Sequence, residues 1–526
     1  MRTGVLVVGG GVVGLTSALF LAQHGVPCVL VERHPDLLIH PRSRGLTPRT
    51  MEVYRQAALE PAILAAAYGG AGFGWAPVQA NTLNDEVYAI PDEPAEDDGA
   101  AASPCGFGPV DQDKLEVLVR ARARELGADL RFFAEMTSFT QNADGVTAAV
   151  TDRGSGASET IEADYLVAAD GADSQVRHAL GIEVGGPGPM FTTLTAIVDA
   201  DLTPALRGRA VTIAYLQQPR PFTILMAHDD AGQRWVFGTG YDPDREPLAS
   251  YTDDRVVDMV RAAAGLAEVE VRLRPQVPGT DVKVLSFPIG AHVAGSYRSG
   301  RVFLAGDAAH ICPPTGGLGA NAGIQDAHNL AWKLGLVLSG RAGGALLDTY
   351  DAERRCVGML TMGQALARFG SRMGPAAGPA IIDYGAVAMG YRYPTARSGG
   401  EPAGQQSSTE PVLPARLSGQ PGTRAPHVPV PGDAARSVLD LFGDTFVLLT
   451  GPARRPWLDA LATLAGQDAL PVPGHQVGAD VCAAYGISDA GASLVRPDGF
   501  VGWRSQAGAA DPAAILSDAI RAALCW

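Results

Sequence analysis

Residues 301–333, RVFLAGDAAHICPPTGGLGANAGIQDAHNLAWK, decide how the rest of this chain can fold. RVFLAG has the β-branched and aromatic residues of a short buried strand, which ends at Gly306 and Asp307. Two prolines and several glycines then disfavour regular structure, and a helical period resumes at Ala322. A carboxylate at the end of a strand lies where ligands bind in α/β sheets. The stretch therefore predicts a binding site between this strand and the helix.

The residues just before that helix are predicted to form an anion site. Backbone N–H groups of Gly319, Ala320 and Asn321 are expected to point out of the helix N-terminus, where the helix dipole favours negative charge. An electron-rich ring edge or developing negative charge would suit this position. The alternative is an ordinary strand, loop and helix in which Asp307 caps a turn, and a Gly-Asp pair alone favours that alternative.

The N-terminal residues contain a glycine-rich turn between a strand and a helix. The strand GVLVV leads into G-x-G-x-x-G at residues 9–14, and a second strand, VPCVLVE, ends at Glu32. In a dinucleotide-binding turn the glycines allow a tight bend, a close pyrophosphate and close helix packing, while the acid accepts from ribose hydroxyls. The turn alone does not distinguish NAD from FAD. The residues assigned to this site are Gly9, Gly11, Val12, Val13, Gly14, Glu32 and Arg33.

Three further segments carry candidate cofactor contacts. Arg42 and Arg44 follow the second strand, where a guanidinium can bind a phosphate or a ribityl chain; a solvated basic turn is nearly as well supported for Arg44. Gln112 opens a predicted helix and either caps it or contacts a cofactor. Asp170 ends a strand in YLVAADGADSQVRHALGI and either caps the next helix or holds a ligand.

Taken in order, the runs around Gly9, Asp170 and Gly306 resemble the class A FAD-dependent aromatic hydroxylases, in the branch that modifies polyketides and has the p-hydroxybenzoate hydroxylase fold. The resemblance covers nearly the whole chain. It implies that Asp307 holds the ribityl chain and that the amides of 319–321 lie near the N1/O2 edge of the flavin. The other FAD contacts that it implies are Arg42, Gln112, Asp170, Gly306, Pro314 and Gly317.

The resemblance also implies a monooxygenase reaction. NAD(P)H would reduce FAD, O2 would form a C4a-hydroperoxide, and one oxygen would pass to a phenolic ring. The chain has one glycine-rich turn of this kind, so NAD(P)H binding is expected to be transient. Arg392 is predicted to face the active site and to support the substrate or a proton step, and a structural arginine held between aromatic rings is the alternative. Structural roles are expected for His310 and His328.

The order of strands and helices predicts an α/β protein of two or three domains. Residues 1–182 and 289–396 are expected to form a Rossmann-like FAD-binding domain. Residues 183–288 are rich in strands and are expected to insert an antiparallel β-sheet substrate domain, helped by 69–108. Residues 397–526 are expected to form a linker and a thioredoxin-like domain, which has no CxxC pair for disulfide chemistry.

Composition excludes several other classes of function. The net charge of −15 argues against nucleic-acid and anionic-membrane partners, which need a cationic surface. The six cysteines have no spacing typical of disulfide frameworks or zinc sites, so no metal is expected and the interpretation is a reduced cytoplasmic protein. No targeting or membrane-spanning segment is predicted. The expected partners are a small aromatic substrate, O2 and NAD(P)H, in a monomer or homo-oligomer.

Three alternatives remain open from the sequence. A Baeyer–Villiger or epoxidising monooxygenase would use the same scaffold, and product NMR would distinguish it. An NAD-dependent dehydrogenase would lack a yellow chromophore. A flavin-binding protein without catalysis would show NAD(P)H oxidation that does not respond to aromatic ligands.

Overall fold

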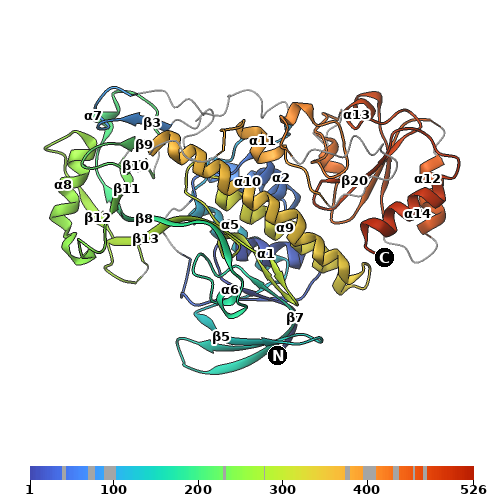
Figure 1. The fold of residues 1–526 in the computed structure, drawn as a ribbon, viewed down its shortest axis with the longest axis horizontal. Coiled ribbons are helices and arrows are strands. Elements are labelled where there is room, and N and C mark those ends of the chain that lie inside the picture. Colours follow the sequence, from blue (N-terminus) through green and yellow to red (C-terminus); the bar gives the residue numbers. More distant parts are fainter. Residues whose placement is uncertain are drawn as a thin grey trace.

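The computed structural model describes residues 1–37, 43–68, 77–87, 102–228, 233–277, 279–373, 379–394, 410–430, 437–453, 456–465 and 471–526. Figure 1 shows a central domain with a mainly antiparallel sheet at one end of the long axis and the C-terminal domain at the other. After the sequence predictions, we call the central domain the flavin-binding domain and the antiparallel sheet the substrate sheet. The predicted α/β class with an inserted antiparallel sheet is confirmed. No described helix has both the length and the apolar character needed to cross a membrane.

The central sheet has the strand order β14-β15-β7-β1-β2-β4, and its four neighbouring pairs from β15 to β4 are parallel. Parallel strands need crossover helices, and α1 and α9 pack on this sheet with a shared apolar core. Its strands are β1 (Arg2–Val8), β2 (Cys28–Glu32), β4 (Asp129–Phe132), β5 (Ala134–Gln141), β6 (Val146–Asp152), β7 (Ser158–Ala168), β14 (Arg298–Ser299) and β15 (Val302–Leu304). Its helices are α1 (Val12–Gln23), α2 (Pro48–Gln56), α3 (Glu60–Ala65), α5 (Gln112–Glu125), α6 (Gln175–Ala179), α9 (Leu318–Leu338), α10 (Asp348–Met373) and α11 (Tyr384–Met389).

The substrate sheet has the order β16-β13-β8-β11-β10-β9-β3 and is antiparallel except where β3 joins β9. β3 comes from the stretch 69–108, of which residues 69–76 and 88–101 lie outside the described residues. The two long strands β8 and β13 run from this sheet into the flavin-binding domain (Figure 1). The elements are β3 (Pro77–Ala80), β8 (Val184–Asp199), α7 (Thr203–Leu206), β9 (Ile213–Leu216), β10 (Thr223–Ala227), β11 (Arg234–Tyr241), α8 (Asp253–Ala264), β12 (Arg272–Arg274), β13 (Val284–Ala294) and β16 (His310–Ile311).

In the described residues, the C-terminal domain has a four-stranded sheet of order β18-β17-β19-β20 and the α-helices α12, α13 and α14. One of its apolar clusters includes Trp332 and Leu336 of α9, so the domain is packed on the flavin-binding domain. Of the segment expected as a linker, residues 423–425 are buried and 397–409 are outside the described residues. The elements are β17 (Val447–Thr450), α12 (Pro456–Ala465), β18 (Gly474–Gln476), α13 (Ala479–Ala484), β19 (Ala492–Val495), β20 (Val501–Ser505) and α14 (Pro512–Ala523).

Helix α9 begins at Leu318, four residues before the position at which the sequence predicts that helical structure resumes. Gly319 and Gly323 are therefore helical, although glycine is a poor helix former. A Cβ at Gly323 would lie 2.9 Å from the Cα of Gly306, so close packing on the strand end requires glycine there. Tertiary packing overrides local propensity in this turn.

Candidate functional site

The turn between β1 and α1 has the geometry of a dinucleotide site. A Cβ at Gly14 would lie 1.9 Å from the carbonyl oxygen of Gly9, which explains why this contact needs glycine. A Cβ at Gly11 would meet only Glu116 Oε1, at 3.8 Å, so the space in front of Gly11 can accept a ligand. Val12 and Val13 form the first helical turn. These residues fit the pyrophosphate of a dinucleotide.

Glu32 lies beside this turn at the end of β2. Its Oε2 accepts a hydrogen bond from the Gly10 N–H at 2.6 Å, and its Oε1 accepts from the His34 N–H at 2.8 Å. Burial alone would raise the pKa of the carboxyl, but the hydrogen bonds from His34 and Gly10 lower it overall. Glu32 is thus held as a carboxylate facing the turn. Arg33 is exposed, and Arg42 lies outside the described residues.

The strand ends at Asp170 and Gly306 are neighbours beside the same turn, because β7 pairs with β1 and β15 pairs with β7. Asp170 Oδ2 accepts from the Val176 N–H at 3.1 Å, although the N-cap residue of α6 is Ser174 and not Asp170. The buried Oδ1 of Asp170 has no hydrogen-bond partner in the described structure. Arg177 donates to the carbonyl of Ala308 at 2.9 Å and so connects the two strand ends. A Cβ at Gly306, whose φ is +61°, would lie 2.7 Å from Val13. Backbone of three motifs therefore converges on one place.

Residues 314–321 form the loop and first turn predicted as an anion site. Pro314 and the neighbouring Asp307 are exposed, and Gly317 is the N-cap of α9 in a left-handed conformation. Gly319, Ala320 and Asn321 lie in the first turn, whose N–H groups have no carbonyl partner within the helix. The Asn321 side chain accepts from Thr47 N–H and donates to the Gly45 carbonyl, so only its backbone can serve a ligand.

Gln112 is the first residue of α5, and its side chain donates to Glu116 Oε1 at 2.8 Å while its N–H donates to the Ser43 carbonyl. Residues 43–47 thus join the start of α5 to the start of α9. Together these contacts bring the described cofactor residues from five separate segments to one edge of the sheet. The sequence order of the motifs does not by itself require this convergence.

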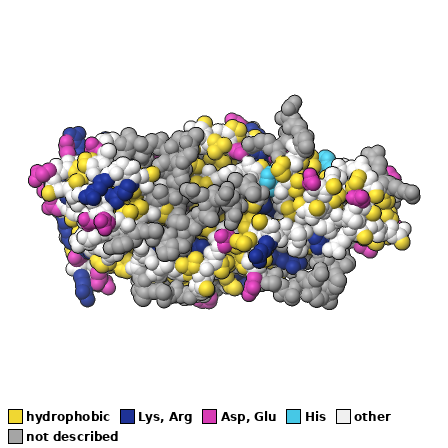
Figure 2. All heavy atoms as spheres, turned by 90° about the horizontal axis from the view of Figure 1, so that it is seen from above, with side chains coloured by type: hydrophobic (Ala, Val, Ile, Leu, Met, Phe, Trp, Pro, Cys, Tyr) yellow, Lys and Arg dark blue, Asp and Glu magenta, His cyan; other side chains and the backbone are white. Residues whose placement is uncertain are grey.

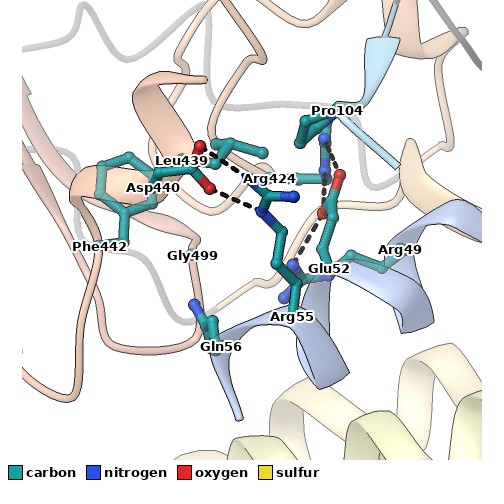
Figure 3. Close-up of a pocket in the computed structure, with 10 residues that line it drawn as sticks. All are labelled: Arg49, Glu52, Arg55, Gln56, Pro104, Arg424, Leu439, Asp440, Phe442 and Gly499. Carbon is teal, nitrogen blue, oxygen red and sulfur yellow. Dashed lines mark hydrogen bonds and ion pairs between the residues drawn. The ribbon is translucent and has the colours of Figure 1, made fainter. Parts of the chain in front are cut away.

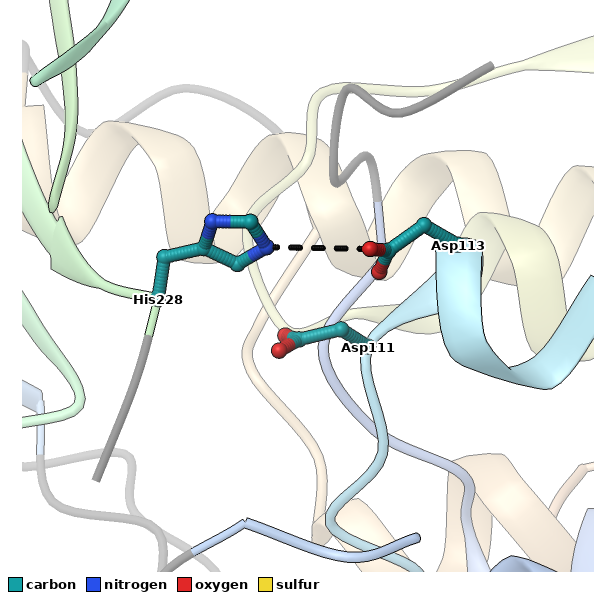
Figure 4. A group of neighbouring side chains, drawn as sticks. All are labelled: Asp111, Asp113 and His228. Carbon is teal, nitrogen blue, oxygen red and sulfur yellow. Dashed lines mark ion pairs between the residues drawn. The ribbon is translucent and has the colours of Figure 1, made fainter. Parts of the chain in front are cut away.

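Arg44 is buried, so its alternative as a solvated turn residue is wrong. Its Nε donates to Asp111 Oδ1 at 2.7 Å, and its guanidinium lies 4.2 Å from the centre of the Tyr68 ring. Asp111, Asp113 and His228 form a group at the joint between α5 and β10 (Figure 4). We call Arg44, Asp111, Asp113 and His228 the substrate joint.

The substrate joint contains polar atoms without partners. His228 Nε2 lies 3.9 Å from Asp113 Oδ2, and neither ring nitrogen has a hydrogen-bond partner in the described structure. Burial lowers the pKa of His228 and raises that of Asp113. The carboxylate and imidazole groups would suit a metal ion. However, Asp111 already pairs with Arg44, and Lys114 Nζ lies 3.8 Å from Asp111 Oδ2, so two positive charges already occupy this place. The group is therefore suited to exchanging a proton or accepting a polar ligand. No motif in the sequence marks it.

Aromatic rings line the junction between the substrate sheet and α10. Phe222 and Phe369 stack at 5.9 Å between ring centres, and Phe191 of β8 stacks on both. Arg372 Nη1 donates to the hydroxyl of Tyr215 on β9 at 3.3 Å. The sequence predicts aromatic contacts in this sheet but does not identify these residues. One reason is that Phe369 belongs to α10 of the flavin-binding domain and not to the sheet.

Arg392 lies on the other side of the flavin-binding domain. Its Nε donates to the Pro421 carbonyl at 2.9 Å, and its backbone bridges Thr423. These contacts face the C-terminal domain and give no support to a catalytic role, which stays a prediction. His310 and His328 are both buried. His310 is hydrogen-bonded to Asp326, and His328 is hydrogen-bonded to Gln56.

Buried ion pairs close the contact between the flavin-binding and C-terminal domains, which we call the C-terminal joint. Glu52 of α2 pairs with Arg49 and Arg424, and Glu353 of α10 pairs with Lys333 and Arg496. A polar cavity beside Glu52 is lined by residues of α2 and of the C-terminal domain (Figure 3). Its charged side chains pair with one another, so it lacks the character of a substrate pocket.

Comparison with known proteins identifies the family. Residues 2–365 match the FAD binding domain family, and residues 418–525 match the aromatic-ring hydroxylase C-terminal domain. The chain belongs to the FAD-dependent aromatic-ring hydroxylases. FAD is therefore the cofactor of this hydroxylase, as the motifs predict.

Relatives and solved structures cover almost the entire hydroxylase. Tetracenomycin B2 monooxygenase-dioxygenase of Streptomyces olivaceus is 41% identical over 97% of each chain. The 4-methyl-5-nitrocatechol 5-monooxygenase of a Burkholderia species is 40% identical over 99% of this chain and 97% of its own. Aklavinone-11 hydroxylase, solved with FAD and aklavinone, superposes with a TM-score of 0.91 at 35% identity, covering 100% of this chain and 99% of its own.

Proposed function

We propose that this hydroxylase uses NAD(P)H and O2 to add one hydroxyl group to a polycyclic, polyketide-type phenol. NAD(P)H, a proton, O2 and the phenol are consumed, and NAD(P)+, water and the hydroxylated phenol are released. Relatives that act on tetracenomycins and a similar structure with bound aklavinone support this substrate class.

FAD would be held by the converging strand ends. The turn from Gly9 to Gly14 would bind the pyrophosphate, and Glu32 the adenosine ribose. Asp307 and the partnerless Oδ1 of Asp170 would accept hydrogen bonds from FAD. Bound FAD supplies the redox and oxygen-transfer chemistry, which these residues do not.

The single observation that carries the substrate proposal is the aromatic set at the junction with α10. Arg368 lies against the glycine loop, because a Cβ at Gly316 would be 3.2 Å from Arg368 Cδ. Its neighbour Phe369 stacks on Phe191 and Phe222 of the substrate domain. A flat aromatic substrate between loop and sheet would therefore meet ring faces, which favour stacking and exclude water.

The protein's own groups would act in two further ways. The free N–H groups at the start of α9 would stabilise negative charge that develops on the bound ring system. The half-buried pair of His228 and Asp113 would lie at the edge of the region at the start of α9, joined to it through Asp111, Arg44 and the 45–47 segment.

A single-ring phenol is the second candidate substrate, because the nitrocatechol monooxygenase is nearly as similar as the tetracenomycin enzyme. Sequence identity does not separate the two ring sizes. Both substrates need the same cofactor chemistry.

The test is anaerobic reduction of the purified holoenzyme by NADPH or NADH, followed by visible absorbance, with a polycyclic phenol, 4-methyl-5-nitrocatechol or no aromatic ligand. We expect the polycyclic phenol to accelerate bleaching of the flavin bands most strongly. After O2 is admitted, the product should gain one oxygen, and its NMR spectrum should show a new phenolic carbon. Acceleration by the nitrocatechol alone would contradict the polycyclic proposal. A ring-inserted ester or an epoxide would establish the Baeyer–Villiger or epoxidising alternative.

A further inference from the structure

Asp326 is a fully buried carboxylate of α9 that is bonded to the strand end Gly306. Its Oδ2 accepts from the Gly306 N–H at 3.1 Å and faces His310 Nε2 at 2.7 Å, while its Oδ1 accepts from Arg354 Nε at 2.7 Å. Burial would raise the pKa of Asp326, but the charges of Arg354 and His310 lower it. The side chain is therefore an ionised acceptor surrounded by donors.

Arg354 of α10 contacts Asp326 on one side and two tyrosines next to the C-terminal domain on the other. Its Nη1 donates to the hydroxyls of Tyr393, at 3.0 Å, and Tyr391, at 3.3 Å. The Tyr393 ring stacks on Phe500, which lies between β19 and β20, with 4.1 Å between ring centres. Tyr391, Tyr393, Phe500 and Val357 form one buried apolar cluster. A continuous set of buried contacts thus joins the C-terminal domain to Gly306.

Gly306 has little freedom to move independently of these contacts. A Cβ there would lie 2.7 Å from Val13, and α9 packs against its Cα through Gly323. The next residue is Asp307, the proposed ribityl ligand. A displaced Gly306 N–H would therefore displace the carboxylate of Asp307.

We propose that the C-terminal domain positions the FAD-binding loop 306–307 through Phe500, Tyr393, Arg354 and Asp326. Asp326 is a positioning residue in this arrangement, since it acts through the Gly306 backbone. The inference rests on the proposed role of Asp307 towards FAD. It gives the C-terminal domain a function in cofactor binding that does not need a redox-active cysteine pair.

Two substitutions test the contacts from opposite ends. In Asp326→Asn, the amide nitrogen would face the Gly306 N–H at the Oδ2 position or the Arg354 Nε–H at the Oδ1 position, so either the loop or Arg354 must shift. Tyr393→Phe removes only the acceptor for Arg354 at 3.0 Å. Tyr485→Phe is the matched control, because Tyr485 is a buried tyrosine of the C-terminal domain whose hydroxyl donates to Pro426, outside these contacts.

The measurements are the dissociation constant of FAD from the full-length protein, the reduction potential of bound flavin and the denaturation midpoint. We expect Asp326→Asn to weaken FAD binding by about tenfold, equivalent to about 1.4 kcal/mol, and Tyr393→Phe to weaken it less. Asp326→Asn and Tyr393→Phe should shift the reduction potential of the bound flavin in the same direction. Tyr485→Phe should change neither the FAD dissociation constant nor the potential. A purely structural role would lower the denaturation midpoint without changing the dissociation constant or the potential, and that result would overturn the inference.

A further variant separates this inference from the proposed function. Asp307→Asn should weaken FAD binding if residue 307 holds the cofactor. Wild-type binding by Asp307→Asn would reject the loop assignment itself. If Asp307→Asn binds FAD weakly while Tyr393→Phe keeps the wild-type FAD affinity and potential, the role of residue 307 stands. Only the proposed role of the C-terminal domain is then rejected. If Asp326→Asn does not fold, Tyr393→Phe and Phe500→Leu decide the question.

Discussion

The two joints of the flavin-binding domain differ in how their buried polar groups are satisfied. At the C-terminal joint, Glu353 meets Lys333 Nζ at 2.7 Å and Arg496 Nη1 at 2.6 Å. At the substrate joint, both solvent-shielded nitrogens of the half-buried His228 side chain lack hydrogen-bond partners in the described structure. The first joint is a closed structural contact, and the second keeps chemical capacity for a ligand or a proton.

This difference has a physical cost that favours a functional explanation. A buried polar group without a partner destabilises the fold, and such groups are rare in native proteins. Charged side chains of both signs are interspersed on the described surface seen in Figure 2, where water satisfies them at little cost. Partnerless buried atoms also occur at the C-terminal joint, but Arg49 Nε and Asn329 Oδ1 belong to side chains that are already bonded through other atoms. The His228 ring has no hydrogen-bond partner at either nitrogen in the described structure, which suits a site for substrate or proton transfer.

The largest expected effect comes from breaking the C-terminal joint. Glu353→Gln leaves the buried Lys333 without its carboxylate and leaves Arg496 with Asp498 as its remaining one, which should cost roughly 3–5 kcal/mol of unfolding free energy. Chemical denaturation measures this loss. Asp348→Asn is the control, because its ion pair with Arg298 is exposed and should contribute about 1 kcal/mol or less. Equal losses in the two variants would contradict the closed nature of the joint.

The folded protein should lose stability in acid because of the buried His328 near the C-terminal joint. Burial, together with the charges of Arg49, His24 and Arg354, lowers the pKa of His328 well below its usual 6.5. Below about pH 6.5 the unfolded chain then binds a proton that the folded chain does not. The unfolding free energy therefore decreases as the pH is lowered in this range, by up to about 1.4 kcal/mol per pH unit.

Denaturation at pH 7.5 and pH 5.5 measures this dependence. His328→Gln should flatten it, whereas His178→Gln, at an exposed site, should not. An unchanged pH dependence in His328→Gln would mean that this ring titrates in the folded protein as it does in the unfolded chain, and would contradict the lowered pKa.

The substrate joint should respond in activity more than in stability. His228→Phe removes two partnerless nitrogens, so the unfolding free energy should change by about 1 kcal/mol or less. Turnover with the polycyclic phenol should fall, and its pH profile should lose the limb that reports this group. Strong destabilisation with an unchanged pH profile would show that the joint is structural after all.

The smallest effect is expected for Arg392→Ala. Its guanidinium serves the Pro421 carbonyl, so its loss should cost about 1 kcal/mol or less of stability and leave turnover at the wild-type rate. Steady-state turnover measures this. A large drop in turnover with unchanged stability would support the predicted catalytic role of Arg392.

The sequence predicted the parts of the site that depend on neighbouring residues. Gly14 and Gly306 are constrained by backbone contacts within strand, turn and helix, and such constraints leave a recognisable spacing. Asp307, Asp170 and the first turn of α9 are predicted as site residues from the same kind of local spacing, and their roles stay predictions. Arg44 was undecided, because its burial depends on Asp111 and Tyr68, which follow it by 67 and 24 residues.

What the sequence by itself determined is the fold class, the FAD motifs and the order of the domains, because local backbone geometry is encoded in consecutive residues. Only the tertiary structure decided which charges are buried and satisfied. Glu52 finds Arg424 across 372 residues, and Asp326 bonds Gly306 and Arg354 from two different elements. The energy of a buried charge depends on the partners and the solvent exclusion that the complete fold supplies, and no local pattern records either.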